Sequence, residues 1–194
     1  MEQRFRYPNE VAHHLFEERK VQEIVNILSD PHWLVAPEDE HLLFEPEFRP
    51  ALMEYLKHHS IYEARQHLLL KSENEEVLDF FIQHWVLGSQ FEQQLCTPEY
   101  RQKWLLKYLQ FHNFADSDNE LMLFEPDMDV YRRFYIGQTE FHSRMAEKRL
   151  FEPEFADDLR LYIENKRTLF NENVELLIAA SPDLADLYRL YKKG

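Results

Sequence analysis

The sequence predicts an all-α protein, an α-solenoid of about six stacked short helical hairpins, and two observations predict it. The tetrapeptide Leu-Phe-Glu-Pro occurs at residues 43–46, 123–126 and 150–153, and a degenerate copy lies at residues 15–18. No segment shows the sustained two-residue alternation of a β-strand. A helical repeat therefore explains the chain better than a sheet does.

The repeat has a slightly elastic period of 26–29 residues. Its units begin at a slot that is usually proline, near residues 18, 46, 72, 98, 126, 153 and 182. Apolar residues follow this slot at offsets 2, 6, 9 and 10, filled by Phe48, Leu52, Tyr55 and Leu56 in one copy. These offsets lie along one face of a helix, so each unit is predicted to open with a helix A.

Two copies depart from this pattern. Arg132 occupies the apolar slot at offset 6, and the copy after Pro98 needs a slip of one residue. Proline suits the first turn of a helix, but Pro50 would fall inside its helix, so that helix is expected to begin near Phe48.

A second apolar cluster in each unit predicts a helix B packed against helix A. The clusters lie around residues 64–70, 91–95, 121–123, 145–150 and 174–178, after turn-like segments at 58–60, 87–89, 113–119 and 137–138. The last unit is expected to be a lone helix A that ends in the polar cap Lys192-Lys193-Gly194. Units this short bury their apolar faces only against neighbours, so residues 1–194 are expected to form a single repeat domain.

The residues also carry a resemblance. The segments 74–84 and 55–64 resemble a helical repeat of about 26 residues in bacterial proteins of unassigned function, and they are similar in size to leucine-rich-repeat-variant and HEAT-like repeats. The resemblance covers nearly the whole chain and its motif is structural. It implies a right-handed superhelix and a binding role, and it carries over no catalytic residue.

Composition excludes several classes of function. The three glycines are too few for a P-loop or a dinucleotide fingerprint. The chain has 22 Lys and Arg against 36 Asp and Glu, a net charge of −14, which disfavours nucleic acid and anionic membranes as partners. The basic residues between Arg132 and Arg167 are interleaved with acids, which favours a salt-bridged surface over an anion site.

The remaining features point to a protein that stays in the cytoplasm. The lone Cys96 cannot form an intrachain disulfide and is expected to be a buried apolar residue rather than a nucleophile. The first ten residues lack the apolar run of a secretory signal, and no segment is long enough to span a membrane. We therefore expect a cytoplasmic protein.

No cofactor is expected, and the metal hypothesis is weak. His58, His84 and His112 recur near offset 12 and would form a row that could ligate a metal. The competing interpretation, that each histidine caps the end of helix A, is favoured. The acidic segment that begins at Asp116 lacks the glycine and the final glutamate of a calcium-binding EF-hand loop, and no pair of acids is singled out for acid–base chemistry.

The favoured function is a non-enzymatic scaffold whose acidic surface binds a basic or amphipathic segment of a partner protein. The candidate anchors are Phe80, Trp85, Trp104 and Phe134, although packing between units competes for the same rings. Two alternatives stay open: an acidic inhibitor or immunity-type protein that neutralises a basic enzyme, and a metal-dependent hydrolase that uses the histidine row. A homodimer formed through aromatic residues at the ends of the stack is a further possibility.

Overall fold

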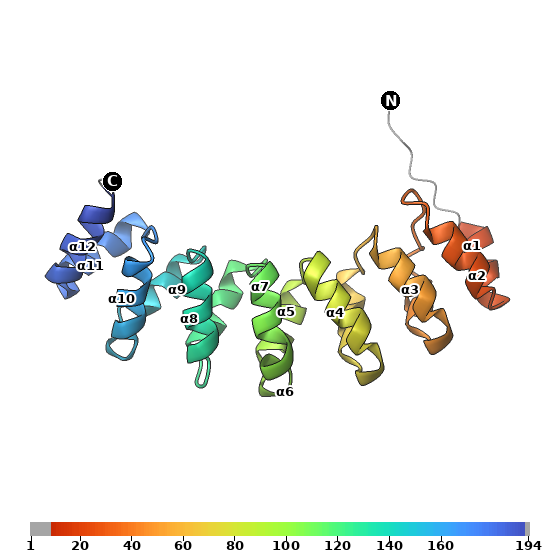
Figure 1. The fold of residues 1–194 in the computed structure, drawn as a ribbon, viewed down its shortest axis with the longest axis horizontal. Coiled ribbons are helices and arrows are strands. Elements are labelled where there is room, and N and C mark those ends of the chain that lie inside the picture. Colours follow the sequence, from red (N-terminus) through yellow and green to blue (C-terminus); the bar gives the residue numbers. More distant parts are fainter. Residues whose placement is uncertain (1–8, 193–194) are drawn as a thin grey trace, which may run out of the picture. The chain divides into compact units, whose positions relative to one another are not determined.

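The computed structural model describes residues 9–192, and it describes side chains from residue 13 onward. All the regular structure in this range is helical, without a strand (Figure 1). The chain divides into two compact units, an N-terminal unit Met1–Trp85 and a C-terminal unit Val86–Gly194. Their boundary falls between the two helices of the predicted third repeat.

The N-terminal unit holds the first helices of the repeat. Its elements are α1 (Asn9–Glu17), α2 (Val21–Leu28), the 3₁₀-helices η1 (Glu40–Phe44) and η2 (Pro46–Phe48), α3 (Arg49–Leu56), the 3₁₀-helices η3 (Glu63–Leu70) and η4 (Ser72–Asn74), and α4 (Glu75–His84). Helix α3 contacts α2 on one side and α4 on the other. Elements η1 and η3 pack beside α3 and α4, so the unit has two layers.

The C-terminal unit repeats the same arrangement. Its elements are α5 (Ser89–Cys96), α6 (Pro98–Tyr100), the π-helical turn η5 (Arg101–Leu105), α7 (Leu106–Phe111), the 3₁₀-helix η6 (Ser117–Phe124), α8 (Asp129–Gln138), α9 (Arg144–Arg149), the 3₁₀-helix η7 (Pro153–Phe155), α10 (Ala156–Glu164), α11 (Asn171–Ala180) and α12 (Pro182–Lys192). Helices α7, α8, α10 and α12 contact one another in that order, and α5, η6 and α9 form a second row behind them (Figure 1).

The helix A predictions agree with these bounds. Each of the seven predicted starts leads into a helix, and α3 begins at Arg49 with Pro50 in its first turn, as expected. The slip after Pro98 coincides with the π-helical turn η5, because one extra residue per turn accommodates it. The expected break at Gly137-Gln138 is wrong, since α8 continues through both residues.

The helix B predictions are confirmed in place but not in pitch. Two of the five predicted segments, η3 and η6, are wound as 3₁₀-helices instead of α-helices. The 3₁₀-helix η1 was not among the predicted segments. The sequences of η3 and η6 contain runs of consecutive apolar residues, such as Leu68-Leu69-Leu70, which carry no 3.6-residue period. In segments this short the two pitches differ by very few hydrogen bonds, so the pattern does not choose between them.

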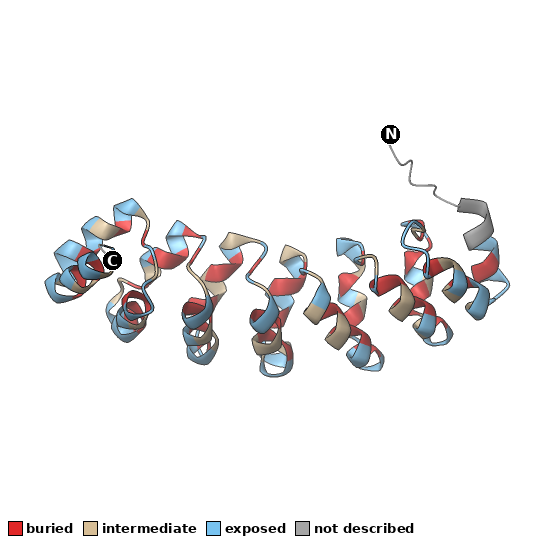
Figure 2. Cartoon of the chain, turned by 45° about the horizontal axis from the view of Figure 1, so that its top comes forward, coloured by how far each residue is buried: buried red, intermediate tan, exposed pale blue. Residues whose placement is uncertain are grey.

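The core lies between the two layers of each unit, where the buried residues face inward (Figure 2). The tyrosines at offset 9, or offset 10 in the slipped copy, are the largest fully buried side chains of the C-terminal unit: Tyr108, Tyr135 and Tyr162 are each at most 1% exposed. Arg132, in the apolar slot at offset 6, is also buried. Its Nε donates to Asp158 at 2.6 Å, and its guanidinium lies over the rings of Phe124 and Phe155. This ion pair explains how a cation occupies a core position.

Polar contacts between repeats join residues one period apart. In the C-terminal unit they include Ser89 with Asp116, Gln93 with Asn119, Arg133 with Asp158, and Arg144 with Glu172, separated by 25–28 residues. Each repeat of this unit is therefore fastened to its neighbour in the chain.

Candidate functional site

The most unusual groups in the chain are three buried glutamates of the C-terminal unit. Glu92, Glu120 and Glu147 lie in α5, η6 and α9, and the exposed fraction of each is 0%. Glutamate is almost never fully buried unless its carboxylate is paired or hydrogen-bonded. We call these residues the clamp glutamates, for the contacts described next.

Glu147 shows the arrangement. Its Oε1 accepts hydrogen bonds from the backbone N–H of Phe170 at 2.8 Å and from Nδ2 of Asn173 at 2.7 Å. Its Oε2 accepts from the hydroxyl of Tyr162 at 3.2 Å. The carboxylate in α9 thus ties together α10, which carries Tyr162, and the start of α11 in the next hairpin.

Glu120 repeats this pattern one period earlier. It accepts from the Tyr135 hydroxyl at 2.7 Å and from the backbone N–H groups of His142 and Ser143. The Nδ1 of His142 also lies 3.3 Å from Oε1.

Glu92 forms the earliest of the three clamps. It accepts from the Tyr108 hydroxyl at 2.6 Å, from the backbone of Ala115 and Asp116, and from Nδ2 of Asn119. All of these partners are donors, which is the complement that an ionised carboxylate requires.

Burial nevertheless perturbs the titration of two of the clamp glutamates, Glu92 and Glu147. It raises the pKa of Glu147 to about 7, against the stabilising hydrogen bonds from Asn173, Phe170 and Tyr162. Burial also raises the pKa of Glu92, and the pKa of Tyr162 rises through burial and the neighbouring Glu147 carboxylate. Perturbed pKa values often mark active sites, so these groups were the first to consider for chemistry.

The geometry gives the clamp glutamates a structural role. With no exposed surface, their carboxylates cannot reach a substrate. The repeat that ends the N-terminal unit supports the same conclusion, because Gln66 stands at the glutamate position and Phe81, fifteen residues later, replaces the tyrosine. In this repeat an amide, Gln66, therefore stands in place of the acid, and the ring of Phe81, which has no hydroxyl, stands in place of the phenol.

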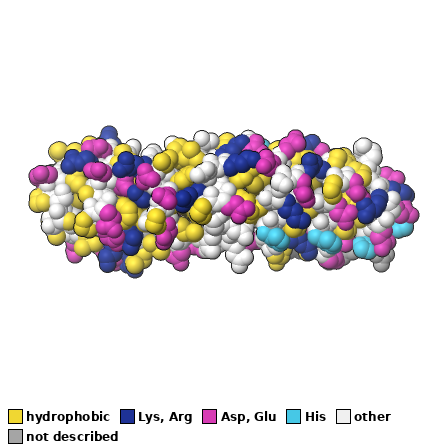
Figure 3. Space-filling view, turned by 90° about the horizontal axis from the view of Figure 1, so that it is seen from below, with side chains coloured by type: hydrophobic (Ala, Val, Ile, Leu, Met, Phe, Trp, Pro, Cys, Tyr) yellow, Lys and Arg dark blue, Asp and Glu magenta, His cyan; other side chains and the backbone are white. Residues whose placement is uncertain are grey.

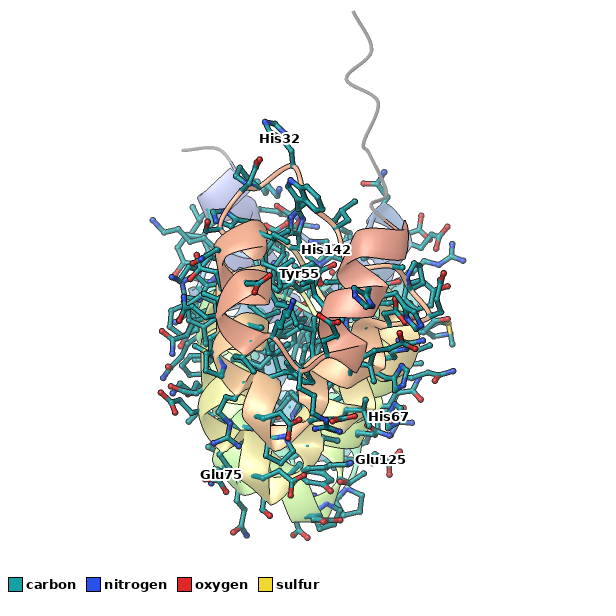
Figure 4. All side chains as sticks on the ribbon, turned by 90° about the vertical axis from the view of Figure 1, so that its right-hand side faces the viewer. His32, Tyr55, His67, Glu75, Glu125 and His142 are labelled. Atoms are coloured by element: carbon teal, nitrogen blue, oxygen red, sulfur yellow. The ribbon has the colours of Figure 1, made fainter. Side chains whose placement is uncertain are left out.

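The sequence carries a signal for these glutamates that the apolar offsets do not include. Glu40 and Tyr55, Glu120 and Tyr135, and Glu147 and Tyr162 are each fifteen residues apart, and the slipped copy has sixteen. The carboxylate of Glu40 is 3% exposed and accepts from the backbone N–H of Tyr62. Figure 4 shows Tyr55 directed between helices, where a core residue lies.

Cys96 is buried in α5, as expected. Burial raises the pKa of its thiol to about 12, and the nearby Glu92 carboxylate adds to the rise. The thiolate that nucleophilic chemistry needs is therefore scarce near neutral pH.

The histidine row does not assemble a metal site. Among residues 9–192 no group of three or more His, Cys, Asp or Glu side chains is placed to hold a metal. His84 stacks on Phe80 with ring centroids 4.0 Å apart, and its Nδ1 lies 2.7 Å from the Phe80 carbonyl oxygen in the last turn of α4. His58 lies beside the ring of His59, and His112 beside that of Tyr108. On the face shown in Figure 3, histidine side chains gather over the N-terminal unit.

The four candidate aromatic anchors are spread over both units. Phe80 is half-buried against His84, and Trp85 is half-buried with its Nε1 donating to the Leu56 carbonyl at 2.8 Å. Trp104 is 8% exposed, so its ring contributes to the core rather than to the surface. Phe134 is half-buried on α8.

An acidic residue at the start of every later helix A is the clearest repeated surface feature. One residue after each of the last six start slots the chain carries an exposed acid, and we call this set the first-turn acids: Glu47, Glu73, Glu99, Asp127, Glu154 and Asp183. The pattern was visible in the sequence and was missed there. Further acids lie close by, including Glu75 and Glu125, which point outward in Figure 4.

Local cations neutralise only part of this surface. Arg19 pairs with Glu47 and lies 3.3 Å from Glu45. Arg101 lies 3.4 Å from Asp127, whose side chain remains 82% exposed, and Arg149 pairs with Glu152. Even if every Lys and Arg were paired one to one, 36 acids against 22 cations would leave a charge of −14. The chain therefore carries a net negative potential that attracts cationic groups.

Comparison with known proteins supplies no family or relative: no family model, no curated protein and no solved structure matches this chain. Within the described range, no helix is both long and apolar enough to cross a membrane.

Proposed function

We propose that the protein is a non-enzymatic binding scaffold, a right-handed α-solenoid whose first-turn acids hold an extended basic segment of a partner protein. The observation that carries this proposal is the recurrence of an exposed acid at the start of six successive A helices. The continuous 26–29-residue period along the sequence supports the solenoid architecture.

The spacing of these acids defines the partner. In the C-terminal unit α7, α8, α10 and α12 contact one another in order, and one acid lies at or just before the start of each of these helical segments: Glu99 in α6, Asp127 in the turn before α8, Glu154 in η7 and Asp183 in α12. Packed helices lie about 8–10 Å apart, whereas an extended chain advances about 3.3–3.6 Å per residue. A segment with Lys or Arg at every third residue therefore presents one cation to each helix.

Acids at helix starts also have a local role, because each one stabilises the helix dipole by about 0.3–1 kcal/mol. The two roles are compatible, but they differ in what they predict. Dipole stabilisation concerns folding alone, whereas partner binding predicts an affinity that falls as salt screens the charges.

The test is fluorescence anisotropy with a labelled peptide that carries Lys at every third residue. The D127N/E154Q/D183N variant removes three first-turn acids, and Asn is tolerated at the left-handed φ of 62° recorded for residue 127. The matched control D118N/E164Q/E175Q removes three exposed acids elsewhere in the same unit.

Exposed ion pairs contribute about 0.2–1 kcal/mol each, so the first-turn variant should bind about 3- to 150-fold more weakly at low salt. The control should change affinity less than about twofold, and a peptide with the same composition but clustered lysines should bind more weakly than the spaced one. Equal losses in the two variants, or no binding of the spaced peptide at low salt, would overturn the proposal.

A further inference from the structure

A pocket at the end of the C-terminal unit has a charge opposite to that of the whole chain. Its volume is about 170 Å³, and it is lined by Lys166, Arg167, Tyr188, Tyr191 and Lys192. On this measure a single water needs only about 10–15 Å³, so the pocket has room for a small ligand. Three cations line it and no carboxylate does, in a chain whose net charge is −14.

The three cations are held in place by neutral groups. Arg167 donates from Nε to the Ile136 carbonyl at 3.0 Å and from its Nη2 to the Gly137 carbonyl at 2.5 Å, at the end of α8. Lys192 donates to the Thr168 hydroxyl at 2.9 Å. Among the described residues no carboxylate forms an ion pair with either side chain, although the nearby Glu140 carboxylate accepts from the backbone N–H of Thr168 at 2.8 Å.

The turn that follows α10 builds one wall of this pocket. Lys166 has a φ of 60°, in the left-handed region that favours glycine. Its ammonium lies 5.6 Å from the centroid of the Tyr191 ring on α12, and the ammonium of Lys192 lies 5.8 Å from that of Tyr188. Both lysines therefore lie against aromatic rings at the pocket. Residue 166 is a lysine, although glycine would be less strained at this backbone conformation.

We propose that this pocket binds a small phosphorylated molecule through its phosphoryl group. Two ammonium groups and a guanidinium supply the charge that a phosphate dianion requires, and the phenol hydroxyls of the two tyrosines can supply hydrogen bonds. The site is separate from the first-turn acids. The earlier part of this basic stretch is salt-bridged through Arg132 and Arg133, as the sequence predicts, whereas Lys166 and Arg167 line a pocket with Lys192.

The probe for the test is inorganic phosphate, titrated into ¹⁵N-labelled full-length protein at constant ionic strength set with chloride. The expected result is saturating amide shifts confined to residues 166–169 and 188–192. Sulfate should produce the same pattern, and acetate, which carries a single negative charge, should bind more weakly.

The K166Q/K192Q variant should weaken phosphate binding at least tenfold. The matched control K148Q/R160Q removes two exposed cations from α9 and α10 and should leave the titration unchanged. Circular dichroism checks that both variants keep their helices. The proposal is overturned if no saturating shift appears below about 50 mM phosphate, if the shifts spread over all Lys and Arg surfaces, or if the two variants respond alike.

Discussion

Burying the Glu147 carboxylate has two consequences: it gives neighbouring donors an acceptor, and it removes a negative charge from water. Replacing Glu147 by glutamine and by alanine separates the effects of these two consequences on stability. In Glu147→Gln the side-chain oxygen still accepts from Phe170 N–H and Asn173 Nδ2, which both bond to Oε1 in the wild type. The new amide nitrogen replaces Oε2 and donates to the Tyr162 oxygen. In Glu147→Ala two buried donors lose their acceptor, whereas the Tyr162 hydroxyl keeps the Thr168 carbonyl at 3.2 Å.

The expected magnitude follows from those two donors. An unsatisfied buried donor costs about 1–3 kcal/mol, so the alanine variant should have a free energy of unfolding about 2–6 kcal/mol below that of the glutamine variant. The glutamine variant should be at least as stable as the wild type at pH 8, because it contains no buried charge. Gln66, at the equivalent position of an earlier repeat, shows that the fold accepts this amide.

The effect of pH has a definite sign. The pKa of Glu147 rises from 4.5 to about 7 on folding, so the folded state binds the proton more tightly than the unfolded state does. The stability that Glu147 contributes is complete below pH 4.5 and is lost as the pH rises through 7. The advantage of Glu147→Gln over the wild type should therefore be largest at pH 8 and shrink towards pH 5.

Urea unfolding followed by circular dichroism, at pH 5, 6.5 and 8, measures these differences. Comparing each variant with the wild type at the same pH cancels the titration of the other carboxylates. Two results would contradict the reasoning: equal stability of the glutamine and alanine variants, or a difference between wild type and Glu147→Gln that does not change between pH 5 and pH 8.

Three further predictions concern other parts of the C-terminal unit. Asp158→Asn leaves the buried Arg132 without its counter-ion and should lower the free energy of unfolding by about 3–5 kcal/mol. Arg133→Gln removes only the exposed partner of the same carboxylate and should lower it by less than about 1 kcal/mol. Urea unfolding of both variants measures the difference. Cys96, whose pKa is raised to about 12, should react with a thiol reagent at pH 8 only as urea opens the unit, and labelling of the folded protein at the rate of a free thiol would count against its burial. Lys166→Gly should raise the free energy of unfolding by about 0.5–1 kcal/mol without phosphate, while Lys148→Gly, inside α9, should lower it by about 1 kcal/mol, as thermal unfolding would show.

Much of the fold could be predicted from the sequence because apolar spacing specifies a helix face directly. The apolar residues at the repeat offsets lie on one face only if the segment is helical. Two copies end in the pairs Tyr135 and Ile136, and Tyr162 and Ile163, and both pairs are buried in helices. Pitch in the second helix of each hairpin was not predictable, since a run such as residues 121–123 buries side chains equally well in either winding. The division into two units after Trp85 was not predictable either, because the repeat keeps its period on both sides of that residue.

The surface and the buried polar contacts were harder to predict for a different reason. A glutamate in an amphipathic helix is normally solvated, so Glu120 and Glu147 were not distinguished from the other acids. Their burial is explained by donors that lie 15 to 26 residues away in the sequence, such as Tyr162 and Asn173 for Glu147. The first-turn acids were missed because acids at helix starts are common for local electrostatic reasons.

The fastening of each repeat to its immediate neighbour has a consequence for how the chain folds and changes in length. Because the contacts in the C-terminal unit span one period, loops closed during folding stay short, and any adjacent pair of hairpins can nucleate the rest. Duplicating residues 120–146, one full step from one clamp glutamate to the next, would supply each new group with its usual partner. An insertion of half that length in a helix would break the register of every clamp it crosses. The spacing of these contacts thus predicts that the C-terminal unit tolerates a change of length by one whole period better than by half a period.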